Sequence, residues 1–230
     1  MHKKMKNLRL ILSCFVISAA LSARAQEVRP DISPTAVYTD DDGLQTETTD
    51  DLSGQAPLMV TFHANPTGMD GLTPLYEWHF RMEGEANDLL VRYEEDTEYT
   101  FTRAGTTIVT LQVNTGVDTV KVEPAVIRVT ISESKLSFPN AFSPNGDDVN
   151  DIYRAKEHQS LVSFHAYIFN RWGQKLYEWT DPAEGWDGTY RGKDVAEGVY
   201  FVLVEAKGAD GREYNIRKDV NLLRGKEISN

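Results

Sequence analysis

Apolar and polar residues alternate with a period of two along much of the chain beyond residue 26. In residues 106–113, for example, Val109, Leu111 and Val113 alternate with a more polar set. This period is typical of a β-strand with one buried face, and turn dipeptides such as Asp187-Gly188 separate the runs. The pattern therefore predicts an all-β protein without a helix, with strands in the runs 58–62, 75–80, 106–113, 125–131, 163–169, 199–206 and 213–223.

Short strands at regular spacing indicate β-sandwiches, and the polar stretch 132–137 is the predicted break between two of them. We therefore expect one sandwich over residues 26–134 and a second over residues 135–230. The first begins with a predicted edge strand at 32–38. An acidic turn, Asp40 to Gly43, and a threonine-rich segment follow, and we expect them at a mobile end of this sandwich.

Residues 1–25 have the features of a cleaved secretory signal peptide. A basic start is followed by the apolar run 10–21, which is short for a membrane span. Ala23-Arg24-Ala25 supplies the small residues that a signal peptidase recognises, so the mature chain would begin at Gln26. An uncleaved anchor and lipidation at Cys14 are the alternatives. No later segment is apolar enough to span a membrane, so the sequence predicts an exported protein.

Charge and cysteine content argue against several classes of function. The chain has 24 Lys and Arg against 35 Asp and Glu, a formal net charge of −11, and removal of the five basic residues of the signal peptide leaves about −16. Nucleic acid is a poor partner for such a surface, because binding depends on neutralising phosphates. The single cysteine, Cys14, lies in the signal peptide. A mature chain without cysteine has no disulfide scaffold, thiolate zinc site or cysteine nucleophile.

No enzyme signature stands out in the predicted mature chain. None of its four histidines, His63, His79, His158 and His165, lies in a His-Glu-x-x-His pattern. The chain also has no Gly-x-Ser-x-Gly elbow and no glycine-rich phosphate loop. We therefore expect a protein that is not an enzyme.

The first predicted sandwich resembles a polycystic kidney disease (PKD) repeat, an Ig-like module. The resemblance rests on residues 56–62, 76–80 and 99–113. Trp78 would be the core aromatic, Gly105 a turn, and Val109, Leu111 and Val113 the inward face. The family usually has a Gly-Asp-Gly turn after its Trp-x-Phe, whereas this chain has Arg-Met-Glu-Gly at 81–84. The resemblance implies a spacer, or a module that contacts a surface protein or glycan.

The second predicted sandwich resembles the gliding motility-associated C-terminal domain, the type B sorting domain of the type IX secretion system of Bacteroidota. Three stretches carry the likeness, at residues 138–151, 168–178 and 185–200. The resemblance implies the type IX translocon and a gliding-associated outer-membrane barrel protein as partners. The motif positions are Phe138, Pro139, Asn140, Phe142, Ser143, Pro144, Asn145, Gly146, Asp147, Asn170, Arg171, Trp172, Gly173, Trp186, Asp187, Gly188, Gly198 and Tyr200.

Three tryptophans of this region, Trp172, Trp179 and Trp186, are either receptor contacts or core residues, and for Trp186 the turn context favours the core. Asn170 to Gly173 lies between two predicted strands and is expected to form a tight hairpin in which Gly173 adopts a positive φ.

An acidic loop offers the best candidate for a metal site. Asn145, Asp147, Asp148, Asn150 and Asp151 place five oxygen-bearing side chains within seven residues, and calcium prefers such oxygen ligands. The alternative is a network of Asx turns, in which these side chains cap the local backbone. The Asp40-Asp41-Asp42 cluster is a weaker candidate, and a solvated turn is the favoured interpretation there.

Together these observations predict a non-enzymatic protein, exported to the cell surface, outer membrane or medium by its C-terminal domain, with the PKD-like domain as a passenger. The rival hypothesis is an adhesin whose PKD-like domain holds a glycan or protein. A row of exposed aromatics in residues 56–131 would favour the adhesin, and a polar face would favour a spacer. Asp118-Thr119-Val120 also resembles the O-glycosylation sequence of Bacteroidota, which makes Thr119 a candidate modification site.

Overall fold

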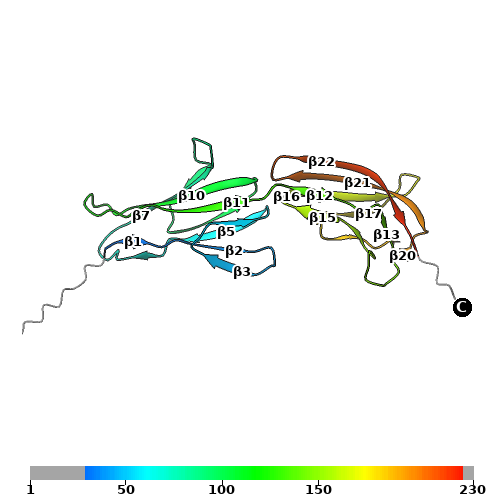
Figure 1. The fold of residues 1–230 in the computed structure, drawn as a ribbon, viewed down its shortest axis with the longest axis horizontal. Coiled ribbons are helices and arrows are strands. Elements are labelled where there is room, and N and C mark those ends of the chain that lie inside the picture. Colours follow the sequence, from blue (N-terminus) through cyan, green and yellow to red (C-terminus); the bar gives the residue numbers. More distant parts are fainter. Residues whose placement is uncertain (1–28, 225–230) are drawn as a thin grey trace, which may run out of the picture.

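The computed structural model describes residues 29–224 of the chain. The predicted signal peptide, the cleavage site before Gln26 and Cys14 lie outside the described residues. Within them the structure consists of strands and turns, without a helix, arranged as two groups of strands placed end to end (Figure 1). No helix of the described part is long and apolar enough to cross a membrane. The prediction of an all-β fold with two sandwiches is confirmed.

The first sandwich consists of two facing sheets. One has the strand order β3-β2-β5-β9 and the other β4-β11-β10-β7-β8, and a two-stranded pair, β1 and β6, lies beside them. Antiparallel pairing dominates, and only β4 pairs parallel to β11. The bounds are β1 Asp31–Ile32, β2 Thr35–Thr39, β3 Gln45–Thr48, β4 Leu52–Gly54, β5 Leu58–His63, β6 Pro66–Thr67, β7 Leu75–Met82, β8 Leu90–Arg92, β9 Asp96–Phe101, β10 Gly105–Asn114 and β11 Ala125–Ile131.

The core of this sandwich forms from the alternating apolar positions of both sheets. Trp78 on β7 is 1 % exposed, and its ring lies 5.7 Å from that of Phe62 on the facing sheet. The indole N–H of Trp78 donates to the main-chain carbonyls of Glu94 and Glu95, at 3.1 and 3.2 Å. Trp78 is thus the central core aromatic, as the PKD-like pattern predicted.

The N-terminal part of the first sandwich differs from the prediction in two respects. The edge-strand assignment of 32–38 was wrong, because β2 lies inside its sheet between β3 and β5. The threonine-rich segment was expected at a mobile end, but it forms β3 and pairs with β2 across the turn at Asp40. The Asp40 carboxylate accepts hydrogen bonds from the amides of Asp42 and Leu44 and from the Thr46 hydroxyl, and so closes this turn. These contacts match the solvated turn favoured for this acidic cluster.

The second sandwich is built on one large sheet with the order β13-β22-β21-β16-β17. Three two-stranded pairs, β12 with β15, β14 with β18 and β19 with β20, accompany this sheet. The bounds are β12 Lys135–Ser137, β13 Ala141–Phe142, β14 Tyr153–Arg154, β15 Glu157–Gln159, β16 Leu161–Phe169, β17 Lys175–Trp179, β18 Gly185–Trp186, β19 Thr189–Tyr190, β20 Lys193–Asp194, β21 Gly198–Gly208 and β22 Glu213–Leu222.

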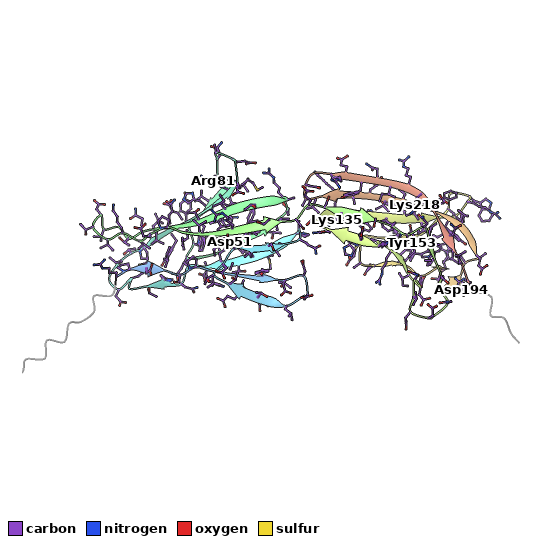
Figure 2. All side chains as sticks on the ribbon, in the orientation of Figure 1. Asp51, Arg81, Lys135, Tyr153, Asp194 and Lys218 are labelled. Carbon is purple, nitrogen blue, oxygen red and sulfur yellow. The ribbon has the colours of Figure 1, made fainter. Side chains whose placement is uncertain are left out.

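The strands of the first sandwich end at Ile131, and those of the second begin at Lys135. Figure 2 shows Lys135 where the two sandwiches meet and Asp194 near the opposite end of the second one. The turn between β21 and β22, at the start of the red segment in Figure 1, points toward the first sandwich. All seven predicted strand runs appear in the structure, as β5, β7, β10, β11, β16, β21 and β22.

Candidate functional site

Most aromatic residues of the sorting motif lie in the core of the second sandwich. Trp186 is 0 % exposed, and its ring lies 5.4 Å from Phe142 and 5.0 Å from Tyr200. Tyr153, from β14, adds a further ring 5.7 Å from Phe142. The indole N–H of Trp186 donates to the carbonyl of Thr189 at 2.8 Å. Trp179 is also buried, so two of the three candidate receptor tryptophans are core residues.

The third tryptophan, Trp172, lies at the tip of the β16–β17 hairpin. Asn170 organises this tip, because its side-chain oxygen accepts hydrogen bonds from the amides of Trp172 and Gln174, both at 3.0 Å. Gly173 adopts a φ of 78°, as predicted, and its N–H donates to the carbonyl of Asn170. Trp172 is 76 % exposed, and the guanidinium of Arg171 lies 4.4 Å from its ring centre. This ring is therefore displayed to solvent on a well-defined turn.

The remaining turn residues of the motif fix the far end of the sandwich. Asp187 accepts hydrogen bonds from the amide and hydroxyl of Thr189, at 2.9 and 2.8 Å. Gly188 has a φ of 79°, and a Cβ there would crowd Leu222 and Pro144. Ser143 donates its N–H to the carbonyl of Asn150 and so closes the acidic loop, and Gly198 begins β21 with a φ of 144°. These positions support the fold.

Sequence reasoning missed Lys218, which ties the first motif stretch to β22. Its ammonium donates to the carbonyls of Phe138 and Pro139, at 3.1 and 3.0 Å, and to the side-chain oxygen of Asn140, at 2.6 Å. Figure 2 shows Lys218 in the upper part of the second sandwich. The signal was present in the sequence: the period of two places Lys218 on the same side of β22 as the buried Val220 and Leu222.

Arg224, the last described residue, was missed as well. Its guanidinium donates to the carbonyls of Pro144 and Gly188, at 3.3 and 3.1 Å, and lies 3.3 Å from the carboxylate of Asp194. Its main-chain N–H donates to Glu197 at 2.7 Å. One side chain thus connects the first and third motif stretches at the end of the sandwich.

The outer face of the large sheet is apolar over residues 167–169 of β16 and 199–203 of β21, and it becomes polar at His165 and Glu205. Phe169 pairs directly with Phe201, and Tyr167 pairs with Leu203. Phe201 is 47 % exposed, and it lines a hollow with Phe169 and Leu203 and a second hollow with Trp172. The two hollows therefore meet at Phe201 and form one surface, which we call the aromatic face: Tyr167, Phe169, Trp172, Val199, Phe201 and Leu203.

The acidic loop is a network of side chains that cap the backbone. Asp151 accepts hydrogen bonds from the amides of Asn145, Gly146 and Asp148, at 2.7, 2.9 and 2.8 Å. Asp147 accepts one from the amide of Val149 at 2.9 Å. Asp148 and Asn150 have φ values of 63° and 56°. Within residues 29–224 no three acidic, histidine or cysteine side chains are grouped as metal ligands. The geometry is that of the Asx-turn alternative, and calcium binding stays a hypothesis.

Asp151 gives this loop a pH dependence. The hydrogen bonds from Gly146, Asn145 and Asp148 hold the pKa of its carboxyl below the ordinary value of 3.8. A lowered native pKa stabilises the fold at neutral pH, and this contribution disappears as the pH falls below 3.8 through the native pKa. We expect Asp151→Asn to lower the melting temperature at pH 7 and to have a smaller effect at pH 2.5, measured by circular dichroism.

An equal loss at both pH values would contradict this role of the Asp151 charge. Asp148→Asn is the matched control, because none of the described hydrogen bonds uses its carboxylate. The same measurement with added calcium separates the two hypotheses for the loop, since a bound cation would raise the melting temperature of the unmodified protein.

The other candidate residues lie apart from this region. Thr119 is exposed in the turn between β10 and β11, and its modification stays a prediction. His63 and His79 are half-buried strand residues, and their rings lie 2.8 Å from the carboxylates of Asp96 and Asp88. These pairs lie in the first sandwich and contact none of the sorting-motif residues.

Comparison with solved structures finds several proteins that resemble this chain at low sequence identity. A Bacteroides ovatus mixed-linkage glucan utilization locus protein, SGBP-B, in complex with a mixed-linkage heptasaccharide, shares 14 % identity and a TM-score of 0.30 over 85 % of this chain and 47 % of that one. This chain thus spans about half the length of that protein. The chicken CNTN1 FN1–FN3 domains share 9 % identity and a TM-score of 0.31, over 77 % of this chain and 68 % of theirs.

A tetra-tandem repeat from the extending region of a large adhesion protein shares 11 % identity and a TM-score of 0.28, over 86 % of this chain and 68 % of that one. Curated protein sequences give no match. Among protein families, residues 136–218 match the CHU_C Type IX secretion signal domain. This segment runs from β12 into β22 and contains all three motif stretches. The second sandwich is therefore a type IX secretion signal domain of the CHU_C family.

Proposed function

We propose that this protein is a non-enzymatic surface protein that the type IX machinery carries across the outer membrane, with the first sandwich as passenger. The observation that carries the proposal is the family match over residues 136–218. A type IX secretion signal implies export to the cell surface or outer membrane. In the proposal a signal peptide takes the chain through the inner membrane, and the signal domain then engages the type IX translocon.

The aromatic face is the surface that we assign to recognition by this machinery. Most motif aromatics lie in the core. The motif residue Trp172 is 76 % exposed, and Phe201, which follows the motif residue Tyr200, is 47 % exposed. Exposed aromatics with an adjacent arginine are typical anchors of protein interfaces. The outer-membrane barrel protein associated with gliding is the proposed partner, with Trp172 and Arg171 at the hairpin tip as its first contacts.

Trp172→Ala tests this assignment. Because the side chain is exposed, we expect the free energy of unfolding to change by less than about 0.5 kcal/mol. The amount of protein at the cell surface should nevertheless fall, since a central aromatic anchor typically contributes about 2 kcal/mol or more to binding. Surface labelling of whole cells, with the total protein quantified in parallel, measures the effect.

Met59→Ala is the matched control, because Met59 is 60 % exposed on β5 of the passenger, away from the aromatic face. Normal surface levels of Trp172→Ala, together with those of Phe201→Ala, would contradict recognition through this face.

A spacer role for the passenger is supported by its outward-facing side chains. On the outer face of β10, Thr106, Thr110 and Gln112 are polar, and the half-buried Ile108 between them is apolar. The exposed apolar residues of this sandwich, Leu44, Met59, Leu75, Tyr93, Val117 and Val126, lie on different strands and loops. In residues 29–131 they do not form a row of aromatics, which is the feature an adhesin of the proposed kind would need.

Dependence on the type IX translocon is the experiment that tests the proposed function. In cells with an active translocon, added protease should degrade the protein on intact cells. In cells that lack the translocon, the same protein should be protected and should be recovered in the periplasmic fraction. Protease sensitivity in both strains would overturn the proposal.

A further inference from the structure

The two sandwiches meet at a buried joint made by two turns of the signal domain. Ser160, between β15 and β16, is 2 % exposed, and Ala209, between β21 and β22, is 8 % exposed. Ala209 packs within the hydrophobic core of the first sandwich rather than that of its own. The turn of the β21–β22 hairpin is thereby inserted into the passenger.

Hydrogen bonds connect this joint to three segments of the passenger. The hydroxyl of Ser160 accepts from the amide of Ala56 at 3.2 Å and lies 2.7 Å from the hydroxyl of Ser132. The amide of Ala209 donates to the carbonyl of Ser160 at 2.9 Å, and the amide of Ala104 donates to the carbonyl of Ala209 at 3.0 Å. Main-chain groups of both sandwiches thus satisfy one another in a buried position.

Hydrogen bonds also hold the segment 132–134, which connects the two sandwiches. The Ser134 hydroxyl, in a residue that is 2 % exposed, donates to the carboxylate of Asp210 at 2.7 Å and lies 2.8 Å from the Tyr214 hydroxyl. A Cβ on Gly208 would collide with the Ser134 side chain, so the segment packs directly on the hairpin backbone. These contacts hold the pKa of Asp210 below its ordinary range.

The backbone conformation of Ser160 is an independent sign that contacts constrain the joint. Ser160 has a φ of 46°, in the left-handed region that residues other than glycine rarely adopt. Such a conformation persists where surrounding contacts determine it, and here the hydroxyl contacts come from the passenger and the carbonyl contact from Ala209. Domains joined by a flexible linker have few contacts across their boundary, whereas here buried hydrogen bonds cross the boundary between the two sandwiches.

We propose that the passenger and the signal domain unfold as one cooperative unit, because the joint makes the β21–β22 hairpin depend on a folded passenger. Both strands of this hairpin lie inside the large sheet of the signal domain. A passenger that has lost its core would release Ala209 and Ala104 and leave the hairpin turn without its partners. The signal is then complete only on a folded passenger.

Hydrogen exchange on the mature chain tests this coupling. Leu111→Ala creates a cavity in the passenger core, at a residue that is 0 % exposed. We expect exchange in peptides covering 198–222 to become about tenfold faster or more, although the substitution lies in the other sandwich. Unchanged exchange in these peptides would overturn the proposal. Ile127→Val, which removes one methylene from the same core, serves if Leu111→Ala does not fold, and a smaller increase is then expected.

The Ser160→Gly variant tests whether the coupling between the two sandwiches depends on the contacts of the joint. Glycine keeps the left-handed backbone but removes the hydroxyl that bonds Ala56 and Ser132. In this background the effect of Leu111→Ala on peptides 198–222 should fall at least about threefold. Arg191→Gly is the matched control, because Arg191 is also left-handed, at a φ of 52°, but exposed on the β19–β20 turn. A coupling equally strong in both glycine backgrounds would contradict the role of the Ser160 contacts.

Discussion

Replacing Trp186 by alanine should strongly destabilise the protein and leave much of it in the periplasm. Trp186 is fully buried against Phe142 and Tyr200, and its indole N–H donates to Thr189. Removing a buried tryptophan typically costs about 3–5 kcal/mol, which is a large part of the about 5–15 kcal/mol that stabilises a domain. Calorimetry of the purified protein measures the stability loss, and cell fractionation measures the export.

Two variants serve as controls for this experiment. Trp186→Phe retains much of the buried ring and should lose clearly less stability than the alanine variant. Trp172→Ala removes the same side chain from an exposed position and should melt like the unmodified protein. Equal melting temperatures for Trp186→Ala and Trp172→Ala would contradict the assignment of Trp186 to the core.

Lys218→Met is expected to destabilise the signal domain by about 2 kcal/mol. Methionine is unbranched and only one atom shorter than lysine, but the carbonyls of Phe138 and Pro139 and the side chain of Asn140 lose their shared donor. Desolvated acceptors without a partner are costly, so the loss should exceed that of an ordinary surface substitution. Denaturant unfolding of the mature chain, followed by tryptophan fluorescence, measures it.

Arg217→Met is the matched control, because Arg217 is the exposed neighbour of Lys218 on β22. It should change the free energy of unfolding by less than about 0.5 kcal/mol. A Lys218→Met variant as stable as Arg217→Met would show that the three acceptors find other partners.

The long strands could be predicted from the sequence because each has one face in a core. In β10 and β11 the period of two follows directly from burial of Val109, Leu111, Ile127 and Val129. β3 escaped prediction, since Gln45–Thr48 is polar on both faces and its pairing depends on the turn that Asp40 closes. Such tertiary and turn contacts leave no hydrophobic pattern.

The sequence indicated which residues carry the sorting motif, but it left their roles open. Trp172 and Trp186 both lie in turn-rich segments next to glycine, yet one is exposed at a hairpin tip and the other fills the core. The difference arises because Trp186 pairs with Tyr153 across β14 and β18. Each of these strands has two residues, which is too short for an alternating pattern in the sequence. Arg224 likewise acts through carbonyls distant in sequence.

The joint at Ser160 and Ala209 would affect export. A signal domain whose hairpin depends on its passenger would present its aromatic face in native form mainly when the passenger is folded. The coupling would then allow the type IX machinery to discriminate between folded and unfolded passengers through the signal domain alone.

Deletion of residues 136–230, followed by fractionation of the cells, tests the export function of the second sandwich most directly. Because the deletion also removes Ser160 and Ala209, limited proteolysis must first establish that the remaining passenger is folded. We expect this folded passenger to stay in the periplasm, while the full chain reaches the surface. Surface exposure of the truncated protein at the level of the full chain would contradict it.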